Sequence, residues 1–121
     1  MNYLESLEDY LERILMLTEK NGQVRSIDIA LDMGYSKPSV SIAMKKLLKK
    51  GYIEIDDKGY ITLKEEGLAI ASKTYEKHKI IYNLLCSMGV SEEVARNDAC
   101  KIEHALSEET VNKLKDYLNI K

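Results

Sequence analysis

The residues Cys100-Lys101-Ile102-Glu103-His104 carry the densest group of metal-ligating side chains in this sequence. On a helix with about 3.6 residues per turn, Cys100, Glu103 and His104 fall within about 100° of arc and share one side. A thiolate, a carboxylate and an imidazole that converge in this way can hold a transition-metal ion. The pentapeptide alone is a weak signal, because a cysteine in a helix is more often a small hydrophobic residue.

Three more residues could supply ligands from other parts of the chain. His78 lies within a charged run, Tyr75-Glu76-Lys77-His78-Lys79, midway along a long predicted helix. Asp9 and Glu12 are three residues apart in the first predicted helix and point away from its apolar stripe. Ordinary solubility is the alternative explanation for these two acids.

Basic residues are concentrated in a different segment. The net charge of the chain is −2, yet no acidic residue occurs between Met33 and Ile53. Five lysines lie there instead: Lys37, Lys45, Lys46, Lys49 and Lys50. The segment 91–109 is predominantly acidic. A local basic patch can bind phosphates even though the whole chain is slightly acidic, and a pair of solvated helix faces is the alternative.

The spacing of apolar residues and glycines predicts a mainly α chain with one small β-hairpin. Helices are expected over about 2–19, 27–33, 37–50, 65–88, 92–106 and 108–119, and strands over 52–55 and 60–63. Ser26, Ser36, Ser91 and Ser107 are the expected helix caps, and a capping box beginning at Thr62 opens the long fourth helix. Apolar stripes are expected to face the core in the first helix (Leu4, Leu7, Leu11, Ile14, Leu15, Thr18) and the third (Val40, Ala43, Met44, Leu47, Leu48).

Three helices followed by a hairpin is the order of a winged helix-turn-helix, with the hairpin as its wing. We therefore expect a DNA-binding domain over 1–63 and a helical dimerisation and metal-binding domain over 64–121. The third helix is the predicted recognition helix. The predicted DNA contacts are Ser36, Lys37, Pro38, Ser39, Ser41, Lys45, Lys46 and, at the wing tip, Lys58. A winged helix used for protein contacts alone is the alternative, and the five lysines argue against it.

The sequence as a whole resembles the diphtheria-toxin-repressor-like metalloregulators, and among them the shorter manganese-transport-regulator branch. The resemblance covers nearly the whole chain. Its carriers are the segments 8–14, 28–30, 36–41 and 63–67, His78, and Asn97-Asp98-Ala99-Cys100-Lys101-Ile102-Glu103-His104-Ala105-Leu106-Ser107. The resemblance implies a homodimeric repressor that binds operator DNA when loaded with Fe²⁺ or Mn²⁺. It assigns the metal ligands to Asp9, Glu12, His78, Cys100, Glu103 and His104.

The ligand set is a hybrid of two branches of that family. Carboxylates at Asp9 and Glu12 match the manganese branch, whereas Cys100 matches the iron branch. The iron branch has an ancillary metal site that uses an acid and a histidine. This chain has Tyr82 and Arg96 at those two positions, so a second metal position is expected at Glu12 and His78 instead. Because carboxylates favour Mn²⁺ and Fe²⁺ while a thiolate favours Fe²⁺, Co²⁺ or Zn²⁺, we expect Fe²⁺ or Mn²⁺ in the cell and allow Zn²⁺ or Co²⁺ in vitro. The chain ends at Lys121, before the SH3-like domain of the longer members.

Two other classes of protein compete with this interpretation. Cys-x-x-Glu-His differs from the inverted zinc-peptidase motif only in its first ligand, but the chain has only two histidines. A winged-helix regulator that ignores metal is the second alternative. With two cysteines and no predicted signal peptide or membrane span, the chain is expected to act in the cytoplasm.

Overall fold

The computed structural model describes the backbone of residues 3–120 and the side chains of residues 7–119. It forms two compact units, Met1–Lys73 and Thr74–Lys121. In chain order the elements are α1 (Tyr3–Asn21), α2 (Ser26–Met33), α3 (Lys37–Lys49), β1 (Ile53–Ile55), β2 (Ile61–Leu63), α4 (Glu65–Ser87), α5 (Glu92–Ile102) and α6 (Glu108–Ile120). The mainly α class with a small hairpin is confirmed. The predicted start of the first helix at Asn2 and the place of the Leu4 side chain lie outside the described residues.

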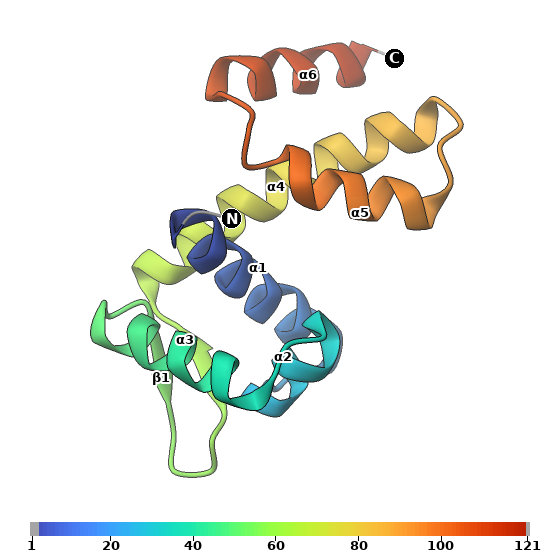
Figure 1. Cartoon of the computed structure of the whole chain (residues 1–121). Coiled ribbons are helices and arrows are strands. Elements are labelled where there is room, and N and C mark those ends of the chain that lie inside the picture. Colours follow the sequence, from blue (N-terminus) through green and yellow to red (C-terminus); the bar gives the residue numbers. More distant parts are fainter. Residues whose placement is uncertain (1–2, 121) are drawn as a thin grey trace. The chain divides into compact units, whose positions relative to one another are not determined.

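The first unit is a three-helix core closed by the hairpin (Figure 1). α1 packs against α2, α3 and β2, and α3 packs against α2 and β1. Leu11 and Ile14 of the predicted stripe are fully buried, as are Ile29, Val40 and Leu47. Leu48, which was expected in this core, is 41% exposed, because Val40, Ala43, Met44 and Leu47 already fill the inner side of α3.

The cap of α3 is Ser36, as predicted, and its hydroxyl oxygen accepts a hydrogen bond from the Ser39 amide at 3.2 Å. The prediction for α2 is wrong. Ser26 is the first helical residue and Arg25 is the cap, whose amide donates to the Asp28 carboxylate at 2.9 Å. The predicted box at Thr62 is also wrong, because Thr62 lies in β2, where it pairs with Glu54. A capping pattern in a sequence therefore predicts a helix start correctly only when its first residue is not part of a β-strand.

Replacing the cap of the recognition helix should weaken the first unit. We expect Ser36→Ala to lower the free energy of unfolding by about 1 kcal/mol, because the amide of Ser39 loses its acceptor. Urea unfolding measures the difference. Ser41→Ala, at an exposed position inside the same helix, is the matched control, and equal losses in the two variants would contradict the capping role.

The wing is an antiparallel pair in which Ile53 faces Leu63 and Ile55 faces Ile61. Its turn is closed by the Asp56 carboxylate, which accepts hydrogen bonds from the amides of Lys58 and Tyr60, each at 2.9 Å. The amide of Ile61 also donates to the carbonyl of Val24 at 2.8 Å. This bond ties the hairpin to the segment just before α2, so the wing is held against the helix-turn-helix.

The second unit contains the later part of α4 together with α5 and α6. The hydroxyl of Ser91 and that of Ser107 accept hydrogen bonds from Val94 and Thr110 respectively, as their predicted capping roles require. α6 is joined to α4 by an ion pair between Lys115 and Glu76. The buried apolar side chains of this unit are small in number and size for a helical core: Ile81, Ala95, Ala99 and Val111. Among the described residues, no helix has both the length and the apolar character needed to cross a membrane.

Candidate metal centre and nucleic-acid interface

Four of the six predicted metal ligands lie together within the second unit. His78 comes from α4, Cys100 from α5, and Glu103 and His104 from the residues that follow α5. Nδ1 of His78 lies 3.1 Å from Oε2 of Glu103 and 3.8 Å from Sγ of Cys100. Nε2 of His104 lies 3.5 Å from the other Glu103 oxygen, Oε1. Glu103 is therefore central, with one carboxylate oxygen toward each histidine.

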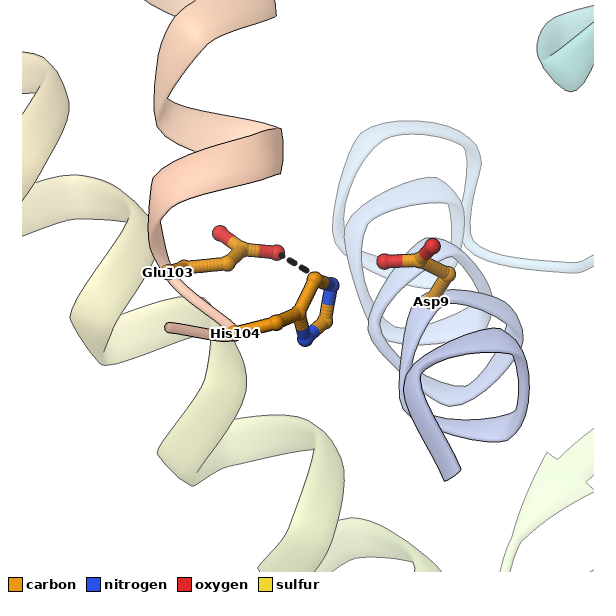
Figure 2. Close-up of side chains that lie close together, drawn as sticks. All are labelled: Asp9, Glu103 and His104. Atoms are coloured by element: carbon orange, nitrogen blue, oxygen red, sulfur yellow. Dashed lines mark ion pairs between the residues drawn. The ribbon is translucent and has the colours of Figure 1, made fainter. Parts of the chain in front are cut away.

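The end of α5 decides this arrangement and corrects the prediction of a single helix face. α5 ends at Ile102 rather than at Leu106, Glu103 is its cap residue, and His104 lies in the turn beyond. The turn is closed by the amide of Ala105, which donates to the carbonyl of Ile102 at 2.9 Å. Figure 2 shows Glu103 at this helix end, with its carboxylate turned toward the ring of His104. It also labels Asp9, which α1 carries in the first unit.

The donor atoms of this cluster fit a divalent transition metal. Ligands bound at about 2.0–2.3 Å from one ion lie roughly 3–3.8 Å from one another. Nδ1 of His78 lies at such distances from Oε2 of Glu103 and from Sγ of Cys100. Glu103 is 1% exposed and His78 5% exposed. A buried carboxylate is costly unless a cation or hydrogen bonds compensate it, so the side chains suit a bound cation.

Tyr82 extends the cluster along α4, one turn beyond His78. Its ring stacks on the imidazole of His78, with 6.3 Å between centroids and 7° between planes. The pKa of the Tyr82 phenol is raised, first by its hydrogen bond with Cys86 and further by burial and by Glu92, while Arg96 acts in the opposite direction. Tyr82 and Arg96 thus occupy the positions at which the iron branch has an acid and a histidine. Neither a neutral phenol nor a guanidinium is a ligand that divalent iron or manganese prefers.

The two remaining predicted ligands, Asp9 and Glu12, lie on α1 in the first unit. They are three residues apart, so their side chains leave the helix on the same side, about one turn from each other. Glu12 is 1% exposed, which ordinary solubility does not explain. Tyr10, next to Asp9, is buried, and burial raises the pKa of its phenol, with Tyr35 and Asp9 adding to the effect.

The predicted DNA contacts form the outer surface of α3 and the wing tip. All eight of them are exposed: Ser36, Lys37, Pro38, Ser39, Ser41, Lys45, Lys46 and Lys58. Lys49 and Lys50 extend the basic surface to the end of the helix. Ile42, which is not among the predicted DNA contacts, also lies on this surface and is 56% exposed. An isoleucine is usually expected in the core. Only its position around α3, opposite the buried residues, predicts that its side chain faces solvent.

The chain combines a winged helix-turn-helix, whose third helix is lined with lysines, with a cluster of a buried histidine, a buried carboxylate and a half-buried cysteine. These are the parts of a DNA-binding regulator with a metal centre. Comparisons with known proteins agree. Residues 2–61 match the family described as the iron dependent repressor, N-terminal DNA binding domain. Residues 64–120 match the iron dependent repressor, metal binding and dimerisation domain. The chain belongs to the iron-dependent repressor family.

Individual relatives support this assignment. The transcriptional regulator MntR of Escherichia coli is 39% identical over 108 residues, which are 89% of this chain and 70% of that protein. An uncharacterized HTH-type transcriptional regulator of Methanocaldococcus jannaschii is 38% identical over 116 residues, 94% of this chain and 93% of that one. The solved structure of the manganese regulator SloR superimposes with a TM-score of 0.80 at 31% identity, over 95% of this chain and 54% of SloR. The chain thus spans about half the length of SloR.

The protein is accordingly a metal-dependent transcriptional repressor with a DNA-binding domain and a metal-binding and dimerisation domain. The relatives are transcription regulators, so the zinc-peptidase alternative is excluded.

Proposed function

We propose that this repressor is activated by Fe²⁺ or Mn²⁺ and binds its operator as a homodimer. The observation that carries the proposal is the buried cluster around Glu103, whose two carboxylate oxygens lie 3.1 Å from His78 and 3.5 Å from His104. This cluster falls within the segment matched by the family's metal-binding and dimerisation domain. The functional division predicted at 1–63 and 64–121 stays a prediction, which the family matches over 2–61 and 64–120 support.

The residues that would hold the ion are His78, Cys100, Glu103 and His104, completed by Asp9 and Glu12 of α1. When bound, a divalent cation supplies positive charge to a ligand set that contains three carboxylates. Those carboxylates favour Fe²⁺ and Mn²⁺, and the thiolate of Cys100 favours Fe²⁺ and also admits Co²⁺ or Zn²⁺. The donor set therefore supports Fe²⁺ or Mn²⁺ as the effector, with Zn²⁺ or Co²⁺ as substitutes in vitro.

The DNA-contacting residues of the proposal divide into two kinds. Lys45, Lys46 and Lys58 are exposed cations placed for phosphates, which give affinity without sequence information. Ser36, Ser39 and Ser41 offer hydroxyl groups, Lys37 an ammonium and Pro38 an apolar surface, at the N-terminal part of α3. Because counterions leave the DNA as phosphates are neutralised, we infer that affinity falls steeply with salt concentration.

Regulation would follow from the way the ligands are distributed along the chain. Asp9 and Glu12 belong to the helix on which the DNA-reading helices pack, and the other four ligands belong to the second unit. Without a cation, Asp9, Glu12 and Glu103 repel one another and the two units are loosely coupled. With their charges compensated, these side chains hold α1 to the dimerisation unit and set the two recognition helices of a dimer about 34–36 Å apart, one turn of DNA. DNA then tightens metal binding by the same factor.

The dimer of this proposal is built on the second unit. Val111, Leu114 and Leu118 follow one another at helical spacing along α6, and Leu114 and Leu118 remain only half-buried in the single chain. A partner subunit would cover them. We place the activity in the cytoplasm, where Cys86 and Cys100, neither of which forms a disulfide in the structure, stay reduced.

The coupling can be tested by titrating the full chain with Mn²⁺, anaerobic Fe²⁺, Co²⁺ and Zn²⁺ while fluorescence anisotropy reports binding to promoter DNA. We expect metal to tighten DNA binding, and Asp9→Ala to remove most of that increase while the metal-free affinity stays the same. Glu19→Ala, which removes an exposed acid from the same helix, is the matched control. If DNA binding ignored metal, the protein would instead be a metal-independent winged-helix regulator. If Asp9→Ala kept the full metal response, the link through α1 would be wrong.

A further inference from the structure

Ile42 is a large apolar side chain on the outer face of the recognition helix. It is 56% exposed, compared with 41% for Leu48, the other exposed large hydrophobic residue of α3. Isolated exposed apolar residues are common, so the exposure of Ile42 does not by itself indicate a function. Its position does suggest one, because the neighbouring side chains on this face of α3 are lysines, serines and a proline.

The helical phase places Ile42 in the middle of that face. Pro38, Ile42, Lys45 and Lys49 follow the spacing i, i+4, i+7, i+11 and so form one row along α3. The buried residues of α3 lie on the opposite side: Val40, Ala43, Met44 and Leu47. Ile42 is flanked by a proline one turn toward the N-terminus and by cations one and two turns toward the C-terminus.

Folding does not account for an isoleucine at this position. Its side chain is outside the buried apolar cluster of the first unit and outside the partly buried residues packed against it. In a helix, isoleucine is also less favourable than lysine or alanine by several tenths of a kcal/mol, because its branched Cβ restricts the rotamer. A residue that neither fills the core nor favours the helix points to a role at the surface.

We propose that Ile42 determines operator specificity by contacting thymine methyl groups in the major groove. The inference rests on the proposed function, in which α3 enters that groove. The C5-methyl of thymine is the apolar group among the base edges there, and an apolar side chain is its natural partner. Isoleucine can neither donate nor accept a hydrogen bond, so guanine or cytosine opposite it would lose hydration without gaining a partner. Lysines at 45 and 49 would meanwhile hold the helix on phosphates of either strand.

A methyl-deletion experiment tests this contact. The metal-loaded full chain is used to select duplexes from a random pool, and in the enriched duplex each thymine is replaced in turn by deoxyuridine, which lacks only the methyl group. We expect one or two replacements to weaken binding by about fourfold each, the effect of one buried methyl group. In Ile42→Ala the same replacements should have no effect, while binding to the unmodified duplex should already be weaker by a similar factor or more.

Two variants sharpen the test. Leu48→Ala removes an exposed apolar side chain from another side of α3, and it should keep the full sensitivity to deoxyuridine. Ile42→Gln supplies an amide that can bond to adenine, so a selection with this variant should shift the preferred base at the same positions. Thermal unfolding checks that each variant folds.

The outcomes separate this inference from the proposed function. If no duplex is enriched with metal, the proposed function fails and the role of Ile42 fails with it. If a duplex is enriched but no deoxyuridine weakens binding, or Ile42→Ala keeps the same sensitivity as the unaltered protein, only the thymine contact is overturned.

Discussion

Glu103→Ala should abolish metal-stimulated DNA binding, the largest functional effect expected of any single substitution in this chain. The Glu103 carboxylate is 1% exposed and reaches both His78, at 3.1 Å, and His104, at 3.5 Å. Its removal takes away one ligand and also the group that orients two others. Because loss of an orienting partner alone typically costs about 10–100-fold in metal affinity, we expect a loss of more than about 100-fold here. Competition with a chromophoric chelator measures the metal affinity, and anisotropy measures the DNA affinity.

The matched control is Glu93→Ala, which removes an exposed carboxylate from the first turn of α5. It changes the net charge equally and should leave metal and DNA binding unchanged. Far-ultraviolet circular dichroism of the metal-free proteins checks that both variants fold. A folded Glu103→Ala protein that still bound metal within tenfold of the original would show that the centre lies elsewhere.

Gly67→Ala should cause the largest loss of stability. Gly67 lies in the first turn of α4, directly over the backbone of the residue that precedes β1. A Cβ at this position would stand 2.1 Å from the carbonyl oxygen of Tyr52 and 2.9 Å from its carbonyl carbon. That carbonyl is held in place, because it accepts a hydrogen bond from the amide of Lys64 at 2.9 Å. The clash is therefore with fixed backbone, and α4 must move away from the wing.

The sign of this effect is diagnostic. Alanine in place of glycine ordinarily stabilises a helix by about 0.5–1 kcal/mol. We expect the opposite here, a loss of roughly 2–3 kcal/mol or more in the free energy of unfolding, as in overpacked cores. Urea unfolding of the metal-free protein measures it, with Ser72→Ala at an exposed position of α4 as control. If the Gly67→Ala protein were as stable as the original, α4 would not pack closely against the carbonyl of Tyr52.

The predicted elements show which features depend on neighbours in the sequence. The order of six helices and a hairpin, the caps at Ser36, Ser91 and Ser107, and the buried row of α1 follow from periodicity and cap chemistry. These are local properties, set by interactions within three or four residues. The donor types of Cys100, Glu103 and His104 also indicate metal-binding chemistry, whereas their predicted place on one helix face is wrong because α5 ends at Ile102.

Other features are settled by residues far apart in the chain. That α5 ends at Ile102, and that His78 of α4 meets Glu103 across 25 positions, depend on how two helices pack. The exposure of Leu48 could not be predicted from the local pattern, because hydrophobicity favours burial of a side chain while packing decides how many side chains the core admits. The helical phase of Ile42, by contrast, already places it outside the buried row of α3. Local sequence patterns are therefore enough to predict the elements, their order and the donor types of the metal centre. The packing of distant segments sets which donors meet and whether a residue such as Leu48 faces solvent, because burial and distance depend on contacts between segments far apart in the chain.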